Sequence, residues 1–320
     1  MPPARLSPNL AEQPVTGRHT LLSALCLSGS VLFWGVSFMA TKTALTGGFS
    51  PMTVVWLRMA IASLTLAPFW SRIPRPQYRK GDIGWLALVC LLQPGIYYLA
   101  ENTAIGMTTS SQAGVISAIV PLLVAAGAWM FLREHISPRT LAGIALSIAG
   151  VVGLSLGATA GAHAPNPVLG NALEVVAMAS AAGATIALKH LLERYNPWLL
   201  TGIQGLVGAV LFLPAALASH PMTWTRVPVT AWVSVVFLGA FVSLAAFGLY
   251  NTAMTMMPAS RAALAINAVP IVALVAGWLV LGESLGALQV GGCVAIAAGV
   301  ALGQSGGGQP PEIETGLAEG

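Results

Sequence analysis

Charged residues are scarce in this chain, at 8% of its 320 residues, whereas apolar residues make up 56%. Soluble globular domains carry about 25% charged residues. The 14 basic and 10 acidic side chains here could not cover the surface of a soluble fold of this length. The same composition excludes intrinsic disorder, a collagen-like repeat and a nucleic-acid-binding domain. The sequence therefore predicts an integral membrane protein.

Catalytic and metal-binding motifs are also missing. The three cysteines lie in apolar runs without a CxxC pair, which excludes a disulfide framework and a cysteine zinc site. The chain has no Walker loop and no HExxH pair. Its one aspartate, Asp82, lies in a predicted loop, and all five histidines lie in tails or loops. We expect no enzyme activity, no cofactor and no metal, with an intramembrane enzyme as the competing class.

Long apolar runs dominate the sequence. A transmembrane helix needs about 20 mostly apolar residues, and turn residues such as Pro165-Asn166-Pro167 separate runs of about this length. The runs are too long for membrane strands and lack period-2 alternation. We predict an all-α protein with ten transmembrane helices over residues 21–41, 52–70, 83–101, 109–131, 140–157, 168–188, 198–217, 230–250, 259–281 and 287–304.

Lysine and arginine placement predicts the orientation. If the N-terminus starts in the cytoplasm, 11 of the 14 basic residues lie on the cytoplasmic side. Arg226 then lies in an outer loop, Lys42 at an outer helix end and Arg58 inside a span. We predict a multi-pass protein of the bacterial inner membrane with two cytoplasmic tails, residues 1–20 and a disordered segment 305–320.

The two halves of the chain repeat each other. A shift of 149 residues aligns Asn102-Thr103-Ala104 with Asn251-Thr252-Ala253 and Val120-Pro121 with Val269-Pro270. Each unit has five helices, an odd number, so the two copies enter the membrane in opposite directions. The sequence predicts a 5+5 inverted repeat, residues 21–157 and 168–304, which is a common architecture of secondary transporters. The same register also aligns Trp129 with Trp278, Glu134 with Glu283, and Gly143 with Gly292.

Several of these segments resemble the EamA family of the drug/metabolite transporter superfamily. They are Trp34-Gly35-Val36-Ser37-Phe38 with Lys42, Pro51 with Arg58, and residues 121–134 with their copy 270–283. The resemblance covers about residues 21–304 and departs at Ser37, where many members carry asparagine. It implies a ten-helix carrier with cytoplasmic termini that mostly exports amino acids or related metabolites. Aromatic amino-acid exporters of the YddG type are similar members, and some members import.

Two prolines occupy matching places in the repeat. Proline within a helix frees a backbone carbonyl and permits bending. We expect Pro121 and Pro270 to be paired hinges facing each other at the midplane, or alternatively fixed kinks needed for packing. Pro94 has Ser243 as its counterpart and is not expected to belong to this symmetric pair.

Polar and aromatic side chains within the spans mark the expected cavity, because a polar side chain facing lipid is costly. Gln93, Ser117 and Thr185 are polar residues of this kind. The candidates for substrate binding are Trp34, Phe38, Lys42, Arg58, Tyr97, Tyr98, Glu101, Gln112, Glu174, Gln204, Tyr250, Asn251 and Asn267.

Alternative roles stay open for five of these candidates. Arg58 and Glu174 lie deep in their spans, where charges need partners or water. They could pair as part of an outer gate, bind the charged groups of an amino acid, or form a structural salt bridge. We expect one of Tyr97 and Tyr98 in the cavity and the other in an aromatic belt. Asn267 is expected to bond either substrate or a neighbouring helix.

Other residues receive structural interpretations. Glu134 and Glu283 lie at helix ends, and Trp129 and Trp278 are expected to be belt anchors. Glycines of helices 140–157 and 287–304 recur every seven residues, which allows close helix approach. These two helices are expected to be either a peripheral scaffold or a dimer interface, since the sequence does not choose between them.

We therefore predict a secondary carrier that moves amino acids or related small metabolites by alternating access, most simply as an exporter. An importer or a channel of the same fold is the alternative. Its partners are a small-molecule substrate and membrane lipid, with no nucleic acid, in a monomer or homodimer. A proton is the simplest coupling ion. Glu174 is its candidate carrier, because burial favours the neutral form of this carboxyl group and a nearby Arg58 favours the charged form.

Overall fold

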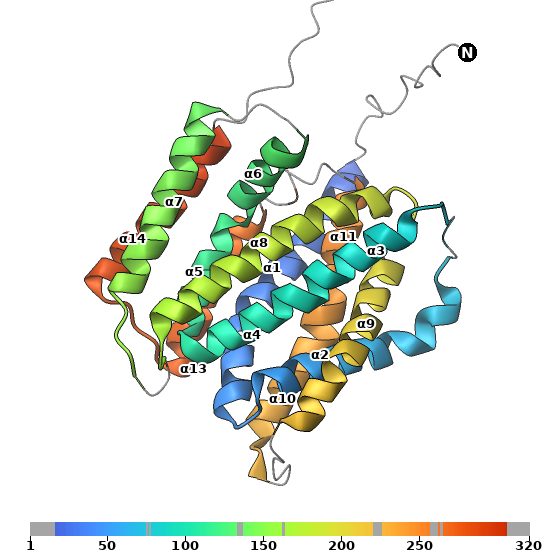
Figure 1. The fold of residues 1–320 in the computed structure, drawn as a ribbon, viewed down its shortest axis with the longest axis horizontal. Helices are drawn as coiled ribbons and strands as arrows, with labels where there is room; N and C mark the ends of the chain where they lie inside the picture. Colours follow the sequence, from blue (N-terminus) through green and yellow to red (C-terminus); the bar gives the residue numbers. More distant parts are fainter. Residues whose placement is uncertain are drawn as a thin grey trace, which may run out of the picture.

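The computed structural model describes residues 17–74, 76, 78–132, 137–161, 164–219, 226–256, 262 and 265–305. Within these ranges the protein is helical and has no strand (Figure 1). Most of both predicted tails, and Glu134 with them, lies outside the described residues. Two shorter apolar helices, Ile266–Leu281 and Ala287–Gly303, accompany eight that are long and apolar enough to cross a membrane. Those eight are Leu21–Thr46, Pro51–Arg72, Asp82–Met107, Ser110–Gly127, Pro138–Leu156, Pro167–Leu192, Pro197–Ala218 and Val229–Met256.

The first part of the chain forms seven α-helices and three interposed segments. They are α1 Gly17–Thr46, α2 Pro51–Leu66 with the 3-10 segment η1 Ala67–Arg72, α3 Asp82–Cys90, the π-helical segment η2 Leu91–Ile96, α4 Tyr97–Met107, α5 Ser110–Ile116, the 3-10 segment η3 Ser117–Ile119, α6 Val120–Leu132 and α7 Pro138–Leu156.

The second part follows a similar order. It comprises α8 Pro167–Leu192, α9 Pro197–Ala218, α10 Val229–Phe237, the π-helical segment η5 Leu238–Ala246, α11 Phe247–Met256, the 3-10 segment η6 Ile266–Ala268, α13 Val269–Leu281 and α14 Ala287–Ser305.

Several helices begin with the same local signal, a serine or asparagine cap followed by proline. The Ser50 and Ser137 hydroxyls each accept a bond from a backbone N–H three residues on, at 3.1 Å. The Asn196 side chain accepts one from the Trp198 N–H at 2.9 Å. The proline that follows each cap lacks the N–H that would otherwise be unsatisfied in the first turn. These signals fix the starts of α2, α7 and α9.

Three helices run several residues further than the sequence predicts. The helix predicted over 21–41 continues to Thr46, the one over 83–101 to Met107, and the one over 230–250 to Met256. The extensions carry buried polar residues, including Lys42, Asn102 and Asn251. The apolar pattern ends where these residues begin, but the helix continues because they find partners inside the protein.

Breaks in the regular helix occur at positions that the 149-residue shift aligns. The 3-10 segments η3 and η6 directly precede α6 and α13, which carry Pro121 and Pro270 in their first turns. The π-helical segments η2 and η5 also match, and they hold Pro94 and Ser243. The backbone of η2 is kinked at Gln93, just before Pro94, where φ is −145° and ψ is 113°. That Pro94 does not belong to the symmetric proline pair stays a prediction.

α7 and α14 lie side by side at one edge of the molecule (Figure 1). Their glycines face each other, because a Cβ atom added at Gly292 would lie 2.6 Å from the Leu154 backbone nitrogen. A Cβ at Gly150 would lie 2.7 Å from the Gly292 carbonyl oxygen. The two glycine faces are thus buried against each other within one chain. This arrangement supports the interpretation of α7 and α14 as a scaffold. Their glycine faces are covered within one chain and are not available for a dimer interface.

We expect Gly292→Leu to destabilise the protein by at least about 1–3 kcal/mol, since the side chain would force two backbones apart. Gly291→Leu is the matched control, because no atom lies within 4 Å of a Cβ built at Gly291. Thermal unfolding in detergent measures both variants. Equal losses in the two midpoints would contradict the close packing of α7 and α14.

Candidate functional site

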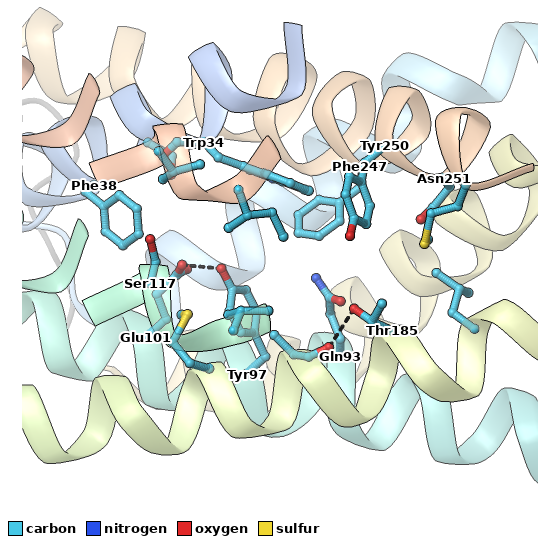
Figure 2. A pocket seen from close by; sticks show the side chains of 18 residues that line it. Trp34, Phe38, Gln93, Tyr97, Glu101, Ser117, Thr185, Phe247, Tyr250 and Asn251 are labelled. Carbon is cyan, nitrogen blue, oxygen red and sulfur yellow. Dashed lines mark hydrogen bonds between the residues drawn. The ribbon is translucent and has the colours of Figure 1, made fainter. Parts of the chain in front are cut away.

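An internal cavity of about 70 Å³ lies between helices from both parts of the chain. Aromatic rings form much of its wall, as Figure 2 shows. The Trp34 ring lies 5.0 Å from the ring of Phe247 and 5.0 Å from that of Tyr250, measured between centroids. The cavity has room for a few ordered waters or part of a small molecule. It runs along α8 from Met178 to Leu188.

Three polar atoms of the cavity-lining residues have no hydrogen-bond partner among the described residues. They are Trp34 Nε1, the Tyr250 hydroxyl oxygen and Asn251 Oδ1. The Asn251 amide is held from its other end, where Nδ2 donates to Thr201 Oγ1 at 3.1 Å. A buried polar group left unsatisfied costs about 1–3 kcal/mol. Three residues of the cavity lining therefore carry buried polar atoms that the described part of the protein does not satisfy.

Glu101 lies at the wall of this cavity and is held by two side chains. The Tyr97 hydroxyl donates to Glu101 Oε1 (Figure 2). Arg58 Nη1 lies 3.4 Å from Glu101 Oε2, and both side chains are nearly fully buried. Arg58 Nε donates to Ser243 Oγ at 2.9 Å, and the guanidinium carbon lies 4.3 Å from the Tyr98 ring centroid. Arg58 thus forms a buried ion pair with Glu101.

Glu174 has no such partner. Its side chain is fully buried, and neither carboxylate oxygen has a hydrogen-bond partner among the described residues. Glu174 lies one turn before Met178, so the two residues share a face of α8. The possible pairing of Glu174 with Arg58 is wrong in this structure, because the partner of Arg58 is Glu101 on α4.

Lys42 and Gln112 lie outside the cavity. Lys42 Nζ donates to the carbonyl oxygens of Ile105 and Thr108, both at 2.7 Å, so it caps the end of α4. Gln112 Oε1 accepts from Asn171 Nδ2 at 2.9 Å, which ties α5 to α8. Both buried side chains are occupied by contacts between helices.

Glu283 closes the same end of the bundle. Its carboxylate accepts from the backbone nitrogens of Ser110 and Ser111 at 2.9 and 2.8 Å. Both serine hydroxyls donate to it as well. A carboxylate at a helix N-terminus satisfies free N–H groups and complements the helix dipole. Glu283 follows α13 and caps α5, in agreement with the structural role expected for it.

Three further candidates lie away from the cavity. Gln204 Nε2 donates to the Gln93 carbonyl oxygen at 2.9 Å, beside a smaller void of about 10 Å³. Tyr98 is 3% exposed, so the expectation that one of the two tyrosines lies in an aromatic belt is wrong. Its ring is covered because Arg58 lies over it. Asn267 lines a separate cleft between α13 and α14, of about 440 Å³.

The structure thus divides the sequence-predicted candidates into two sets. Phe247 was missed, although it lies three residues before Tyr250 on the same helix face and lines the cavity. The candidates that line the cavity are Trp34, Phe38, Tyr97, Glu101, Tyr250 and Asn251. Those placed elsewhere are Lys42, Arg58, Tyr98, Gln112, Glu174, Gln204 and Asn267.

A polar cluster at the opposite end of the bundle from Glu283 joins α3 to the turn after α8. Asp82 is the first residue of α3 and is buried, rather than lying in a loop as the sequence suggests. Arg194 Nη2 lies 2.5 Å from Asp82 Oδ1, and the Tyr195 hydroxyl donates to Asp82 Oδ2 at 3.0 Å. Burial and the bond to Asp82 raise the pKa of Tyr195. Asp82 therefore serves a contact between helices.

Comparison with known proteins agrees with this architecture. The model of the EamA-like transporter family matches residues 21–156 and again residues 168–303. The chain belongs to the EamA-like transporter family. The crystal structure of another protein is similar to this one with a TM-score of 0.62, over 88% of this chain and 95% of the other. At 20% identity, that likeness concerns the fold alone.

Curated relatives of this EamA-like chain are named transporters. An uncharacterized transporter of Archaeoglobus fulgidus is 28% identical over 86% of this chain and 96% of its own length. The uncharacterized transporter YetK of Bacillus subtilis is 26% identical over 76% of this chain and 75% of its own length. A probable terminal-alkyne amino-acid exporter of Streptantibioticus cattleyicolor is 29% identical over 84% of this chain and 89% of its own length. These relatives support a membrane transporter with a small-molecule substrate and point away from an enzyme.

We expect Arg58→Gln to cost about 3–5 kcal/mol of stability, because it leaves the buried Glu101 carboxylate without its cation. The double variant Arg58→Gln/Glu101→Gln removes both charges and should recover much of that loss. Arg72→Gln, at an exposed position after α2, is the control. Thermal unfolding of the wild type and the three variants in detergent measures these changes. A double variant no more stable than Arg58→Gln would contradict the buried ion pair.

Proposed function

We propose that this protein is a secondary carrier that exports amino acids or related small metabolites across the bacterial inner membrane. The cavity carries this proposal, because it is buried between the two parts of the chain and its lining residues hold three unsatisfied polar atoms. A pocket with an apolar wall and few convergent polar groups is typical of small-molecule sites. Export is suggested by the named amino-acid exporter among the relatives.

Two similar halves are a common basis of alternating access, and we propose for this protein a ten-span 5+5 inverted repeat over residues 21–157 and 168–304. The family model matches two adjacent stretches of nearly these bounds. The matching positions of η3 with η6 and of η2 with η5 also support the repeat. Two halves of this kind can exchange conformations around a central site.

The proposed orientation places both termini in the cytoplasm and makes this conformation face inward. The cavity runs along α8 to Leu188, next to Lys189 in the basic last turn of that helix. The opposite end is closed by the capping contacts of Lys42 and Glu283. Basic residues favour the cytoplasmic side of a membrane. We take a proton as the coupling ion and Glu174 as its carrier.

Counterflow in proteoliposomes, with a panel of labelled amino acids, tests the proposed function directly. We expect saturable exchange of at least one of them and roughly fivefold weaker apparent affinity in Tyr250→Phe, which removes one hydroxyl contact to the substrate. Stability should not fall, because this hydroxyl has no partner among the described residues. Tyr78→Phe, at an exposed position, is the control. Absence of exchange for the whole panel would contradict the substrate class.

The paired prolines are proposed as hinges. Pro121→Ala and Pro270→Ala should each slow exchange more than they weaken substrate binding, since a continuous helix bends less readily. The amount of folded protein should stay near normal. Rates of counterflow and binding isotherms of each variant provide the measurement. If both variants fail to fold, the prolines serve assembly and not transport.

A further inference from the structure

A cleft of about 360 Å³ opens where the α2–η1 span ends and α9 begins. It is separate from the central cavity, because no residue lines both. Its walls come from α2 and η1 in the first part of the chain and from α9 and η5 in the second. α2 and α9 pack against each other here (Figure 1). A ligand held in this cleft would therefore contact both parts of the bundle.

The deepest part of the cleft is apolar. Leu66 and Leu244 are the most buried residues of its lining, at 5% and 7% exposure, and belong to one core cluster. Phe69, in the wall contributed by η1, is 53% exposed. The cleft thus opens to the outside of the bundle, which in a membrane protein is surrounded by lipid. Its apolar part is suited to a hydrocarbon chain.

The aromatic walls of the cleft are held by close packing on glycines. A Cβ atom added at Gly248 would lie 2.4 Å from the Trp198 ring, and one at Gly202 would lie 2.8 Å from the Trp70 ring. Both rings are therefore fixed against helices of the second part of the chain. Trp70 and Tyr78 are also 43% and 58% exposed. Exposed tryptophan and tyrosine are typical of the level of the lipid headgroups.

The mouth of the cleft is polar and carries a cation. Arg72 is exposed, with its guanidinium carbon 6.0 Å from the Phe69 ring centroid, and forms no ion pair among the described residues. Asn196 Oδ1 accepts from the Trp198 N–H at 2.9 Å, so the amide is held and its Nδ2 can donate to a ligand. No described acidic residue lines the cleft, and the exposed Glu193 lies outside its lining.

The chain that follows the mouth adds positive charge. Residues 72–82 contain one acidic residue, Asp82, and four basic ones, which are Arg72, Arg75, Arg79 and Lys80. Asp82 is already paired with Arg194 and accepts from the Tyr195 hydroxyl. Because Tyr195 directly precedes Asn196, this contact ties the basic segment to the mouth of the cleft. The net charge here is positive.

We infer that this cleft binds an anionic phospholipid, with an acyl chain in the apolar part and the phosphate at Arg72 and the Asn196 amide. A guanidinium group binds phosphate oxygens through paired, charge-assisted hydrogen bonds. Basic pockets between membrane-spanning helices are typical sites for anionic headgroups. The cationic headgroup of a zwitterionic lipid would meet like charges here. The site is independent of the substrate that the protein transports.

Competition between two lipids with the same acyl chains tests the inference. Native mass spectrometry of the detergent-purified full chain is carried out with equal amounts of dioleoylphosphatidylglycerol and dioleoylphosphatidylcholine. We expect the phosphatidylglycerol to be preferred roughly fivefold in the first bound lipid, since one basic residue near the membrane surface contributes about this much. Phosphatidylglycerol should also raise the thermal unfolding midpoint more than phosphatidylcholine does.

Two outcomes of this competition overturn the inference. Equal binding of the two lipids would show that the cleft does not recognise an anionic headgroup. sn-Glycerol 3-phosphate has a similar headgroup but no acyl chain, and it should neither bind detectably nor displace the lipid. Displacement by this compound at the lipid's own concentration would assign the mouth to a soluble phosphate ligand.

Arg72→Gln removes the cation at the mouth and should lose the roughly fivefold preference for phosphatidylglycerol. In detergent without lipid it should unfold as wild type does, because the exposed side chain has no ion pair among the described residues. Arg139→Gln removes the same charge at an exposed position outside the cleft lining and should keep the preference. A preference retained in Arg72→Gln, or lost equally in both variants, would overturn the site.

Thr65→Phe tests the place of the acyl chain without changing charge. Thr65 is an exposed residue of the cleft wall, and its hydroxyl bonds only within its own helix, to the Ile61 carbonyl oxygen at 2.8 Å. The larger ring should fill part of the cleft and weaken binding of phosphatidylglycerol roughly tenfold. Leu64→Phe, at a 71% exposed position outside the lining, is the matched control. Unchanged lipid binding in folded Thr65→Phe would overturn the inference.

Discussion

Burial of the Arg58 guanidinium inside an apolar helix bundle constrains the surrounding structure. A charge at this depth needs a counter-charge and hydrogen-bond acceptors from the protein. Glu101 provides the counter-charge, and the Ser243 hydroxyl oxygen accepts a hydrogen bond from Arg58 Nε. The Tyr98 ring covers one face of the guanidinium group. These partners come from α4 and η5. The contact therefore fixes how α2 meets a helix of its own half and a helix of the other half.

Helix ends are satisfied in the same way, by side chains from distant parts of the chain. Glu283 caps α5, Lys42 caps α4, and Lys189 Nζ donates to the Met254 carbonyl oxygen at 2.7 Å. Such bonds replace water, which is absent from the membrane interior. Because they join separate helices, rearranging the bundle requires new partners for each freed group. This favours a few discrete arrangements over continuous deformation.

The cavity differs from the helix ends, because polar atoms of its lining residues have no hydrogen-bond partner among the described residues. Among the described residues, Trp34, Tyr250 and Asn251 hold polar atoms without a hydrogen-bond partner, and so does Glu174, one turn before the cavity-lining Met178 on α8. Each of these groups reduces stability unless something binds there. The Arg58–Glu101 ion pair meets the cavity directly, because Glu101 lines it, whereas the glycine-mediated packing of α7 on α14 lies at the edge of the molecule.

Patterns in the amino-acid sequence were sufficient to determine much of the helical structure of this protein. Apolar runs and cap-proline signals determined much of the helical structure, and the 149-residue shift placed Pro121 and Pro270 at matching positions, just after the 3-10 segments η3 and η6. The pattern also determined that residues such as Glu101 and Tyr250 are buried, because polar groups avoid lipid. Each of these results, apart from the repeat, depends on residues close together in the sequence.

Tertiary structure alone decided which buried polar group meets which. It paired Arg58 with Glu101, left Glu174 without a partner among the described residues, and placed Lys42 on the carbonyl groups at the end of α4. It also placed Asn267 in a cleft apart from the cavity. Helical periodicity gives the face of each residue, but not the rotation and depth at which that face meets another helix. Those are set by the packing of all helices at once, because each buried charge must find its partner in the same arrangement.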